Sequence, residues 1–124
     1  MTREQVKRKV REYIRQNNSV SYIELQRLLD ELEYNYRGDL CIVSSKCERA
    51  IFWDGWNQDA IDLMNEIQDE GGIHKEPTQF LTYLLGGGGL SLPIVQSAVD
   101  LKQDCWIPVV FCPGPEKARN RDNG

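Results

Sequence analysis

The sequence predicts an α+β fold with about five helices and short β-strands or hairpins. Three observations predict it: apolar residues recur at helical spacing in several segments, short runs of strand-forming residues lie between them, and glycine, asparagine and proline separate the two kinds of segment. The chain has 124 residues, of which 40% are hydrophobic and 27% are charged. This length and composition predict a single compact domain over residues 1–115.

The first two helices are predicted by their apolar stripes and their caps. An apolar stripe that includes Val6 and Ile14 runs along residues 3–16, and the sequence NNS ends that helix. Ser21 and Glu24 have the spacing of a capping box, in which each side chain satisfies a backbone N–H of the first turn. They open a second helix, whose inward side chains are Leu25, Leu28, Leu29 and Leu32.

A hairpin and a third helix follow. LCIVS at 40–44 and AIFWD at 50–54 are rich in β-branched and aromatic residues, which predicts two short paired strands. Asn57 is positioned to cap the next helix, and the glycines of EGG end that helix near residue 70. Its inward side chains are Ala60, Leu63, Met64 and Ile67.

The last part of the chain alternates again between extended and helical segments. GIHKEP at 72–77 is extended, a helix opens at Thr78, another runs from about 92 to 101, and an apolar strand covers 105–112. Pro108 lacks a backbone donor, so it restricts this strand to a sheet edge or a bulge. Residues 116–124 contain no apolar side chain larger than alanine and predict a flexible tail. The helix after Thr78 turns four side chains inward: Phe80, Leu81, Leu84 and Leu85.

The order of elements over residues 58–112 is helix, short strand, helix, turn, helix and strand, which resembles the winged helix-turn-helix family. Residues 3–54 give a looser version of the same order, with the hairpin in the place of a wing and without a clear third helix. Ile14 to Val20 and Ile67 to Ile73 have the same spacing, which suggests a degenerate tandem repeat with sub-units 1–56 and 57–115. The resemblance implies a winged-helix-like fold and, as one function, nucleic-acid binding through the third helix of the motif.

Positive charge is concentrated in the first helix. Residues 1–16 contain six basic and two acidic side chains, so they carry +4, whereas the whole chain carries −4 and the remaining residues therefore carry −8. Lys7, Arg11 and Arg15 lie four residues apart, away from the apolar stripe. They are the first candidates for an interaction surface, and a solvated helix face without a partner is the alternative.

Further candidates lie on or beside the predicted hairpin. Trp56 follows the DG turn, where an exposed tryptophan would be a strong contact residue, and packing in the core is the alternative. Lys46 and Arg49 add positive charge between the two strands. The candidate interaction surface therefore consists of Lys7, Arg11, Arg15, Trp56, Lys46 and Arg49.

The glycine run GGGG at 86–89 does not have the pattern of a phosphate-binding loop. No strand precedes it and no GK[ST] sequence follows it, and Ser91 stands where the last glycine of GxGxxG would be. We therefore expect a mobile turn in which Gly86 ends a helix in the left-handed conformation, and we predict no cofactor. A bare anion nest of backbone N–H groups is the alternative.

The four cysteines and the single histidine do not predict a metal or catalytic site. Cys41 and Cys47, like Cys105 and Cys112, are spaced more widely than the two cysteines of a zinc knuckle, so we expect unbridged, metal-free thiols. His74 has no cysteine or serine near it in the sequence, and only a partner supplied by the fold would give it a catalytic role. We predict no catalytic residues.

These observations predict a small, non-enzymatic protein-interaction or regulatory module with a protein partner or a second copy of itself. No apolar run approaches the roughly 18 residues of a membrane span, and the N-terminal segment is charged where a secretory signal is apolar, so we expect a cytoplasmic protein that does not bind membranes. The alternative function is a winged-helix nucleic-acid-binding transcriptional regulator. The acidic net charge favours protein over nucleic acid as the partner.

Overall fold

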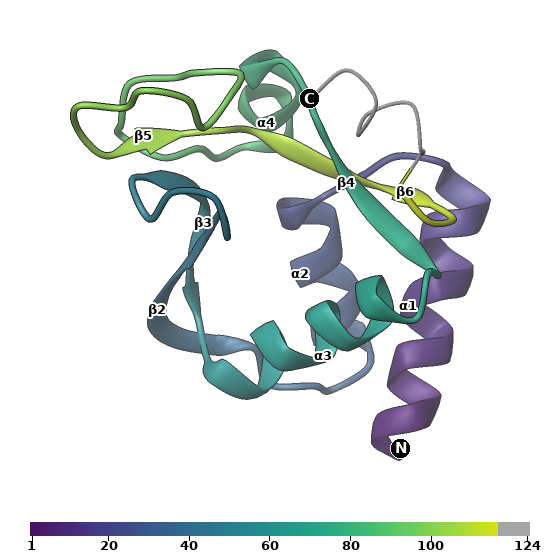
Figure 1. The fold of residues 1–124 in the computed structure, drawn as a ribbon. Coiled ribbons are helices and arrows are strands. Elements are labelled where there is room, and N and C mark those ends of the chain that lie inside the picture. The colour runs from purple at the N-terminus through teal and green to yellow at the C-terminus, as the bar shows by residue number, and fades with distance from the viewer. Residues whose placement is uncertain (117–124) are drawn as a thin grey trace.

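The computed structural model describes residues 1–116 and has a mixed α+β architecture (Figure 1). In this part of the chain there are four helices: α1 (Arg3–Asn17), α2 (Tyr22–Glu31), α3 (Gln58–Asp69) and α4 (Phe80–Gly86). The strands are β1 (Val20–Ser21), β2 (Arg37–Val43), β3 (Ala50–Trp56), β4 (Ile73–Pro77), β5 (Cys105–Trp106) and β6 (Val109–Pro113). Of the predicted tail at 116–124, only Glu116 lies within the described residues.

Local capping residues set the starts of the first three helices. Thr2 and Gln5 form a capping box at α1, and the predicted capping box of Ser21 and Glu24 at α2 is confirmed. The Asn57 side chain accepts a hydrogen bond from the backbone N–H of Ala60 at the start of α3. These short-range hydrogen bonds explain why the helix starts can be predicted from sequence.

The strands form two three-stranded sheets. One sheet has the order β1-β6-β4 and is antiparallel, and the other has the order β2-β3-β5, in which β3 and β5 are parallel. The predicted hairpin is β2–β3, with strands longer than expected. In Figure 1, β5 and β6 follow each other along nearly one line, so the chain passes from one sheet directly into the other.

The position of Pro108 differs from the prediction. We expected it to restrict a single strand to a sheet edge or a bulge, but β6 is the central strand of its sheet. Pro108 lies between β5 and β6, outside both strands, and its carbonyl oxygen accepts a hydrogen bond from the N–H of Thr78. A proline there interrupts no ladder, because its missing N–H falls where the chain changes sheets.

One hydrophobic cluster contains side chains from Val6 to Phe111, so the two halves of the chain share a core. Its largest fully buried members are Trp56, Tyr22, Tyr83 and Phe111. Tyr22 lies edge-on to both Trp56 and Phe111, with ring centroids 5.5 and 5.1 Å away. Such edge-to-face pairs stabilise a core beyond the effect of buried area alone.

The predicted helix at 92–101 is not formed, so the expectation of about five helices is corrected to four in the described chain. Instead, the backbone beside Pro93 pairs with β5: the N–H of Trp106 donates to the Pro93 carbonyl, and the N–H of Val95 donates to the Trp106 carbonyl. A backbone group bonded across the fold is not available to a helix. The apolar residues in this segment still pack on the core, although they are not helical: Leu92, Val95, Ala98 and Leu101.

The glycine run closes α4 and then passes close to other side chains. Gly87, rather than Gly86, adopts the left-handed conformation with φ of 95°. A Cβ atom at Gly88 would lie 3.1 Å from Ile23, and one at Gly89 would lie 3.2 Å from the Trp106 ring. The run therefore combines a helix cap with two positions of close packing, which explains more than one of its glycines.

Candidate functional site

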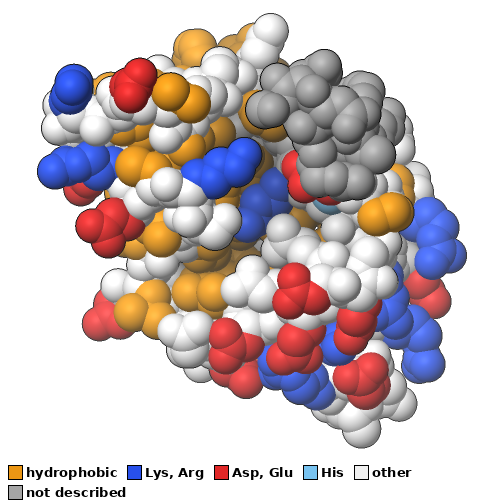
Figure 2. All heavy atoms as spheres, in the orientation of Figure 1, with side chains coloured by type: hydrophobic (Ala, Val, Ile, Leu, Met, Phe, Trp, Pro, Cys, Tyr) orange, Lys and Arg blue, Asp and Glu red, His pale blue; other side chains and the backbone are white. Residues whose placement is uncertain are grey.

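Lys7 and Arg11, expected on an exposed surface, are instead paired with acidic side chains of α3. Lys7 is 3% exposed, and its Nζ lies 2.6 Å from Glu70, 3.4 Å from Glu66 and 3.3 Å from Glu4. Arg11 lies 3.3 Å from Glu70. In Figure 2, basic and acidic side chains are intermixed over α1 and α3. The packing of α1 on α3 is the reason why the predicted basic surface is not available, and only Arg15 of the three is exposed without an ion pair to a described residue.

Arg3, at the start of α1, joins the same network. Its guanidinium lies 2.8 Å from Glu66 and 3.0 Å from Asp59. The hydrogen bond from Arg3 lowers the pKa of Glu66, and the hydrogen bond to Glu70 raises the pKa of Lys7. Each shift favours the charged form of its own group, because each group has an oppositely charged partner on the other helix.

The expectation that Trp56 is exposed is wrong. It is fully buried, and its indole N–H donates to Gln26 Oε1 at 3.0 Å. Trp53 donates to the same oxygen at 2.8 Å. The interior satisfies both indole donors, so burial of these tryptophans leaves no polar group without a partner.

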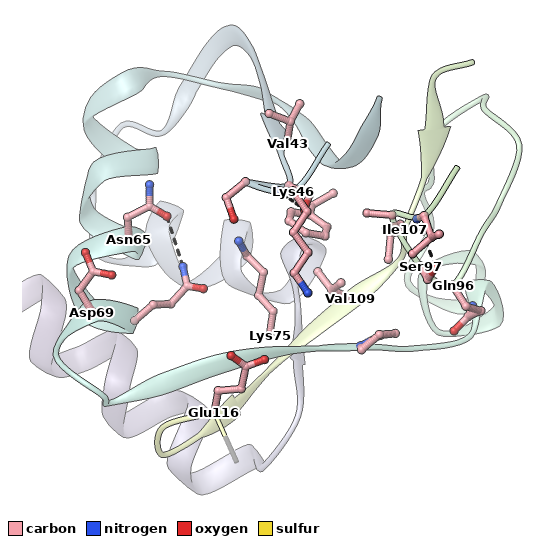
Figure 3. Close-up of a pocket in the computed structure, with 17 residues that line it drawn as sticks. Val43, Lys46, Asn65, Asp69, Lys75, Gln96, Ser97, Ile107, Val109 and Glu116 are labelled. Atoms are coloured by element: carbon pink, nitrogen blue, oxygen red, sulfur yellow. Dashed lines mark hydrogen bonds between the residues drawn. The ribbon is translucent and has the colours of Figure 1, made fainter. Parts of the chain in front are cut away.

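The predicted hairpin residues Lys46 and Arg49 are both exposed, in the loop between β2 and β3. Arg49 lies 3.8 Å from Asp104. Lys46 lines a cleft of about 860 Å³ between this loop, α3, β4 and the segment at 96–99 (Figure 3). The space-filling view shows hydrophobic and basic side chains on this hollowed side of the molecule (Figure 2).

Lys75 reaches into the cleft from β4 and was not singled out from the sequence (Figure 3). Its Nζ lies 4.5 Å from the centre of the Phe52 ring, and no carboxylate of residues 1–116 lies within 4.0 Å of it. Burial lowers the pKa of Lys75 to about 8. The cleft therefore presents a cation that a negatively charged group would stabilise, beside apolar side chains such as Val43 and Ile107.

The four residues of α4 that were expected to face inward are exposed. The exposed fractions are 48% for Phe80, 47% for Leu81, 61% for Leu84 and 81% for Leu85. Only Tyr83 of this helix is buried: its hydroxyl donates to the Val109 carbonyl and accepts from the Tyr22 N–H. Tyr83 thus fixes α4 to the core by the side opposite to its leucines. We call Phe80, Leu81, Leu84 and Leu85 the α4 apolar face.

The fold also gives His74 partners that it lacks in the sequence. His74 lies directly opposite Cys112 in the β4–β6 pairing, and its Nε2 lies 2.6 Å from Glu76 Oε2. Donor atoms of His74, Glu76 and Cys112 all lie within 4.8 Å of one another. No disulfide links any of the four cysteines. Pairing of strands that are far apart in the sequence created this cluster, so cysteine spacing could not reveal it.

Comparison with protein-family models, with curated proteins and with solved structures gives no match. Within residues 1–116, no helix has the length and apolar character needed to cross a membrane.

Proposed function

We propose that the chain is a non-enzymatic protein-interaction module that associates with a second copy of itself through the α4 apolar face. The observation that carries this proposal is the exposure of four large apolar side chains on one short helix, with exposed fractions from 47% to 81%. Large apolar side chains gathered on a surface mark contact sites more often than scattered ones do. A cytoplasmic, regulatory role belongs to the same proposal.

The geometry of α4 favours a rigid contact surface. The apolar residues have the spacing i, i+1, i+4 and i+5, which places them on one side of the helix. Tyr83 anchors the other side through two hydrogen bonds, and Arg27 donates to the Gly86 carbonyl at the end of the helix. A surface that is held in place before association loses little conformational entropy when it binds.

The uncharged, self-complementary character of the α4 region suits a second copy as the partner. Residues 77–99 contain no charged side chain, whereas the chain as a whole carries −4. Two acidic copies repel each other over most of their surface, and an uncharged apolar face is where that repulsion is smallest. Contact between two α4 faces is also self-complementary, as a two-fold dimer requires. Stable dimers bury about 800 Å² per partner, so the contact must extend beyond this seven-residue helix.

Sedimentation velocity over a range of protein concentrations tests the proposal. We expect the wild-type sedimentation coefficient to rise with concentration towards that of a dimer. Leu84→Glu and Leu85→Glu should remain monomeric with an unchanged melting temperature, because each places a charge at the contact and neither side chain is part of the core. Leu40→Glu, on β2, is the matched control, since Leu40 is an exposed leucine on another element.

Two outcomes would contradict the proposal. One is a wild-type protein that stays monomeric at every concentration. The other is a dimer that Leu85→Glu and Leu40→Glu weaken equally, which would place the contact elsewhere.

The winged-helix alternative, nucleic-acid binding, draws support from a different set of residues. Arg8, Lys9 and Arg15 are exposed on α1 and form no ion pair with described residues, and Lys46 and Arg49 lie on the hairpin loop. These cations could contact phosphates. Gel shifts with random duplex DNA at two salt concentrations test it: binding that weakens steeply with salt supports the alternative, and its absence at low salt argues against it.

A further inference from the structure

The side chains of His74, Glu76 and Cys112 converge on one face of the β1-β6-β4 sheet. His74 and Cys112 are directly opposed in the antiparallel pairing of β4 and β6, so their side chains share a face. Glu76 lies two residues further along β4, and alternation along a strand places it on that face as well. Lys75, between them, lies on the opposite face and lines the cleft.

The hydrogen bonds of His74 leave one ring nitrogen to accept. Nδ1 lies 2.9 Å from the Gly114 carbonyl oxygen, which can only accept, so Nδ1 carries a proton. Nε2 then faces the Glu76 carboxylate at 2.6 Å. A neutral ring with its proton on Nδ1 has a lone pair at Nε2, so two acceptors meet at this distance. A proton on Nε2 makes this contact an ion pair, and a metal ion can take the place of that proton once the two donor atoms move apart.

We propose that His74, Glu76 and Cys112 form a binding site for a divalent transition-metal ion of the zinc class. The ligands are His74 Nε2, a Glu76 carboxylate oxygen and the Cys112 thiolate, and water occupies the fourth position. Metal binding requires an unprotonated imidazole nitrogen and a thiolate, so any proton on His74 Nε2 or Cys112 Sγ is released when the ion binds. The Gly114 carbonyl holds the ring in the required tautomer, as outer-shell acceptors do in known zinc sites.

The distances fit this assignment after small side-chain rotations. Zinc bonds of about 2.0 to 2.3 Å in a tetrahedron separate neighbouring donor atoms by about 3.4 to 3.6 Å. Donor atoms here lie within 4.8 Å of one another, and the nitrogen and oxygen 2.6 Å apart must separate by less than about 1 Å. His74 is 7% exposed and Glu76 is about half exposed, so the site has one buried ligand and one that solvent reaches.

The geometry favours a metal site over a nucleophilic cysteine. In a Cys–His–acid arrangement, one ring nitrogen faces the thiol and the carboxylate orients the ring from the other nitrogen. Here Nδ1 is hydrogen-bonded to the backbone carbonyl of Gly114, and Nε2 faces the Glu76 carboxylate. Thiol and carboxylate would therefore compete for the same nitrogen, whereas a metal ion binds all three donors at once.

Cobalt(II) titration of the full-length, tag-free protein after removal of metal with a chelator tests the site. Thiolate ligation gives a charge-transfer band in the near ultraviolet, and we expect this band to saturate at one cobalt per chain and to disappear when zinc is added. Cys112→Ser should abolish the band. Cys41→Ser, which removes an exposed thiol on β2, is the matched control and should leave the band unchanged.

The other two ligands give an independent measurement. Glu76→Gln and His74→Gln should each weaken zinc binding by more than the roughly 10- to 100-fold that loss of an outer-shell partner costs. Glu76→Gln changes a half-exposed side chain, so it remains informative if His74→Gln does not fold, and circular dichroism checks the fold of each variant. The site is refuted by a wild-type protein without the cobalt band, by a band that survives Cys112→Ser, or by unchanged zinc affinity in Glu76→Gln.

Discussion

The basic side of α1 and the α4 apolar face both differ from what their residue types predict, in opposite directions. Lys7 has a charged side chain of the kind that is normally exposed, and it is 3% exposed. Leu85 has a typical core side chain, and it is 81% exposed. Residue type alone therefore assigns these two positions to the wrong environments.

The difference between the two helices lies in what packs against them. From Arg3 to Arg11, α1 lies beside α3, whose Glu66 and its neighbour Glu70 supply the carboxylates that let Lys7 leave water. A buried charge is tolerated when it is paired in this way. By contrast, α4 has only seven residues and contacts the core through Tyr83, so no described element covers its other side. Burial is decided by the neighbouring element and not by the side chain.

The largest effect on stability is expected when a core side chain is truncated, and truncation of a surface side chain is the comparison. Trp56→Ala removes a fully buried indole and should lower the free energy of unfolding by about 3 to 5 kcal/mol. Leu85→Ala should change it by about 0.5 kcal/mol or less, because this leucine makes little contact with its own chain. Urea unfolding followed by circular dichroism measures both. Equal losses in the two variants would show that the α4 apolar face is part of the core, which would break the comparison.

Lys75 sharpens the comparison, because it is a partly buried cation without the acidic partners that Lys7 has. Its folded pKa of about 8 lies below the ordinary value of 10.5, so the unfolded chain binds more protons between these two values. The destabilising effect of Lys75 is therefore complete below about pH 8 and is lost as the pH rises to about 10.5.

Replacing this cation should stabilise the protein. Lys75→Met keeps the length of the side chain and should raise the free energy of unfolding at neutral pH by up to about 3 kcal/mol, the value that corresponds to the pKa difference. The advantage of the variant over the wild type should shrink steadily from pH 8 to pH 10.5 in urea unfolding. Lys46→Met, which removes an exposed cation of the same cleft, is the control and should show no such pH dependence. A destabilised Lys75→Met variant would mean that the charge has an intramolecular partner.

The smallest effect is expected from single ion pairs between α1 and α3. Arg3 lowers the folded pKa of Glu66 below its ordinary value of 4.5, so the stability that Glu66 contributes is present above that pH and is lost as the pH falls through the folded value. Glu66→Gln should lower the urea midpoint slightly at neutral pH, and added salt should reduce the difference. Glu12→Gln, on α1 but without an ion pair to any of residues 1–116, should leave the midpoint unchanged both at neutral pH and below pH 4.5. A difference between Glu66→Gln and the wild type that persists well below pH 4.5 would show that charge is not its cause.

Several elements of the fold could be predicted because their causes are local. The capping box at Ser21, the cap at Asn57 and the hairpin depend on residues within a few positions of one another. The helix expected at 92–101 had the right apolar spacing, but Trp106 bonds to the backbone on both sides of Ile94, so this part of the segment forms a β-bridge instead of a helical turn. Apolar periodicity predicted that these residues pack on the core, and it could not exclude a competing backbone partner.

The candidate sites were less accessible from sequence because each depends on long-range pairing. Of the residues proposed for interaction, Lys46, Arg49 and Arg15 are on the surface, whereas Lys7 and Trp56 are inside. Alternation in the segment from His74 to Glu76 was a usable signal, since it places Lys75 on one face of a strand and its two neighbours on the other. The sequence of that segment does not indicate which of its two faces lines the cleft and which lies beside Cys112.

By itself, the sequence determined the mixed α+β class, the starts of three helices and the hairpin, because backbone hydrogen bonding and side-chain periodicity act over a few residues. Tertiary structure decided that β6 pairs with both β1 and β4, that Lys7 is neutralised by α3, and that the α4 apolar face has no cover within the described chain. Each of these depends on contacts between segments separated by tens of residues. Many combinations of such contacts satisfy the same local preferences, and only the packing of the whole core selects one of them.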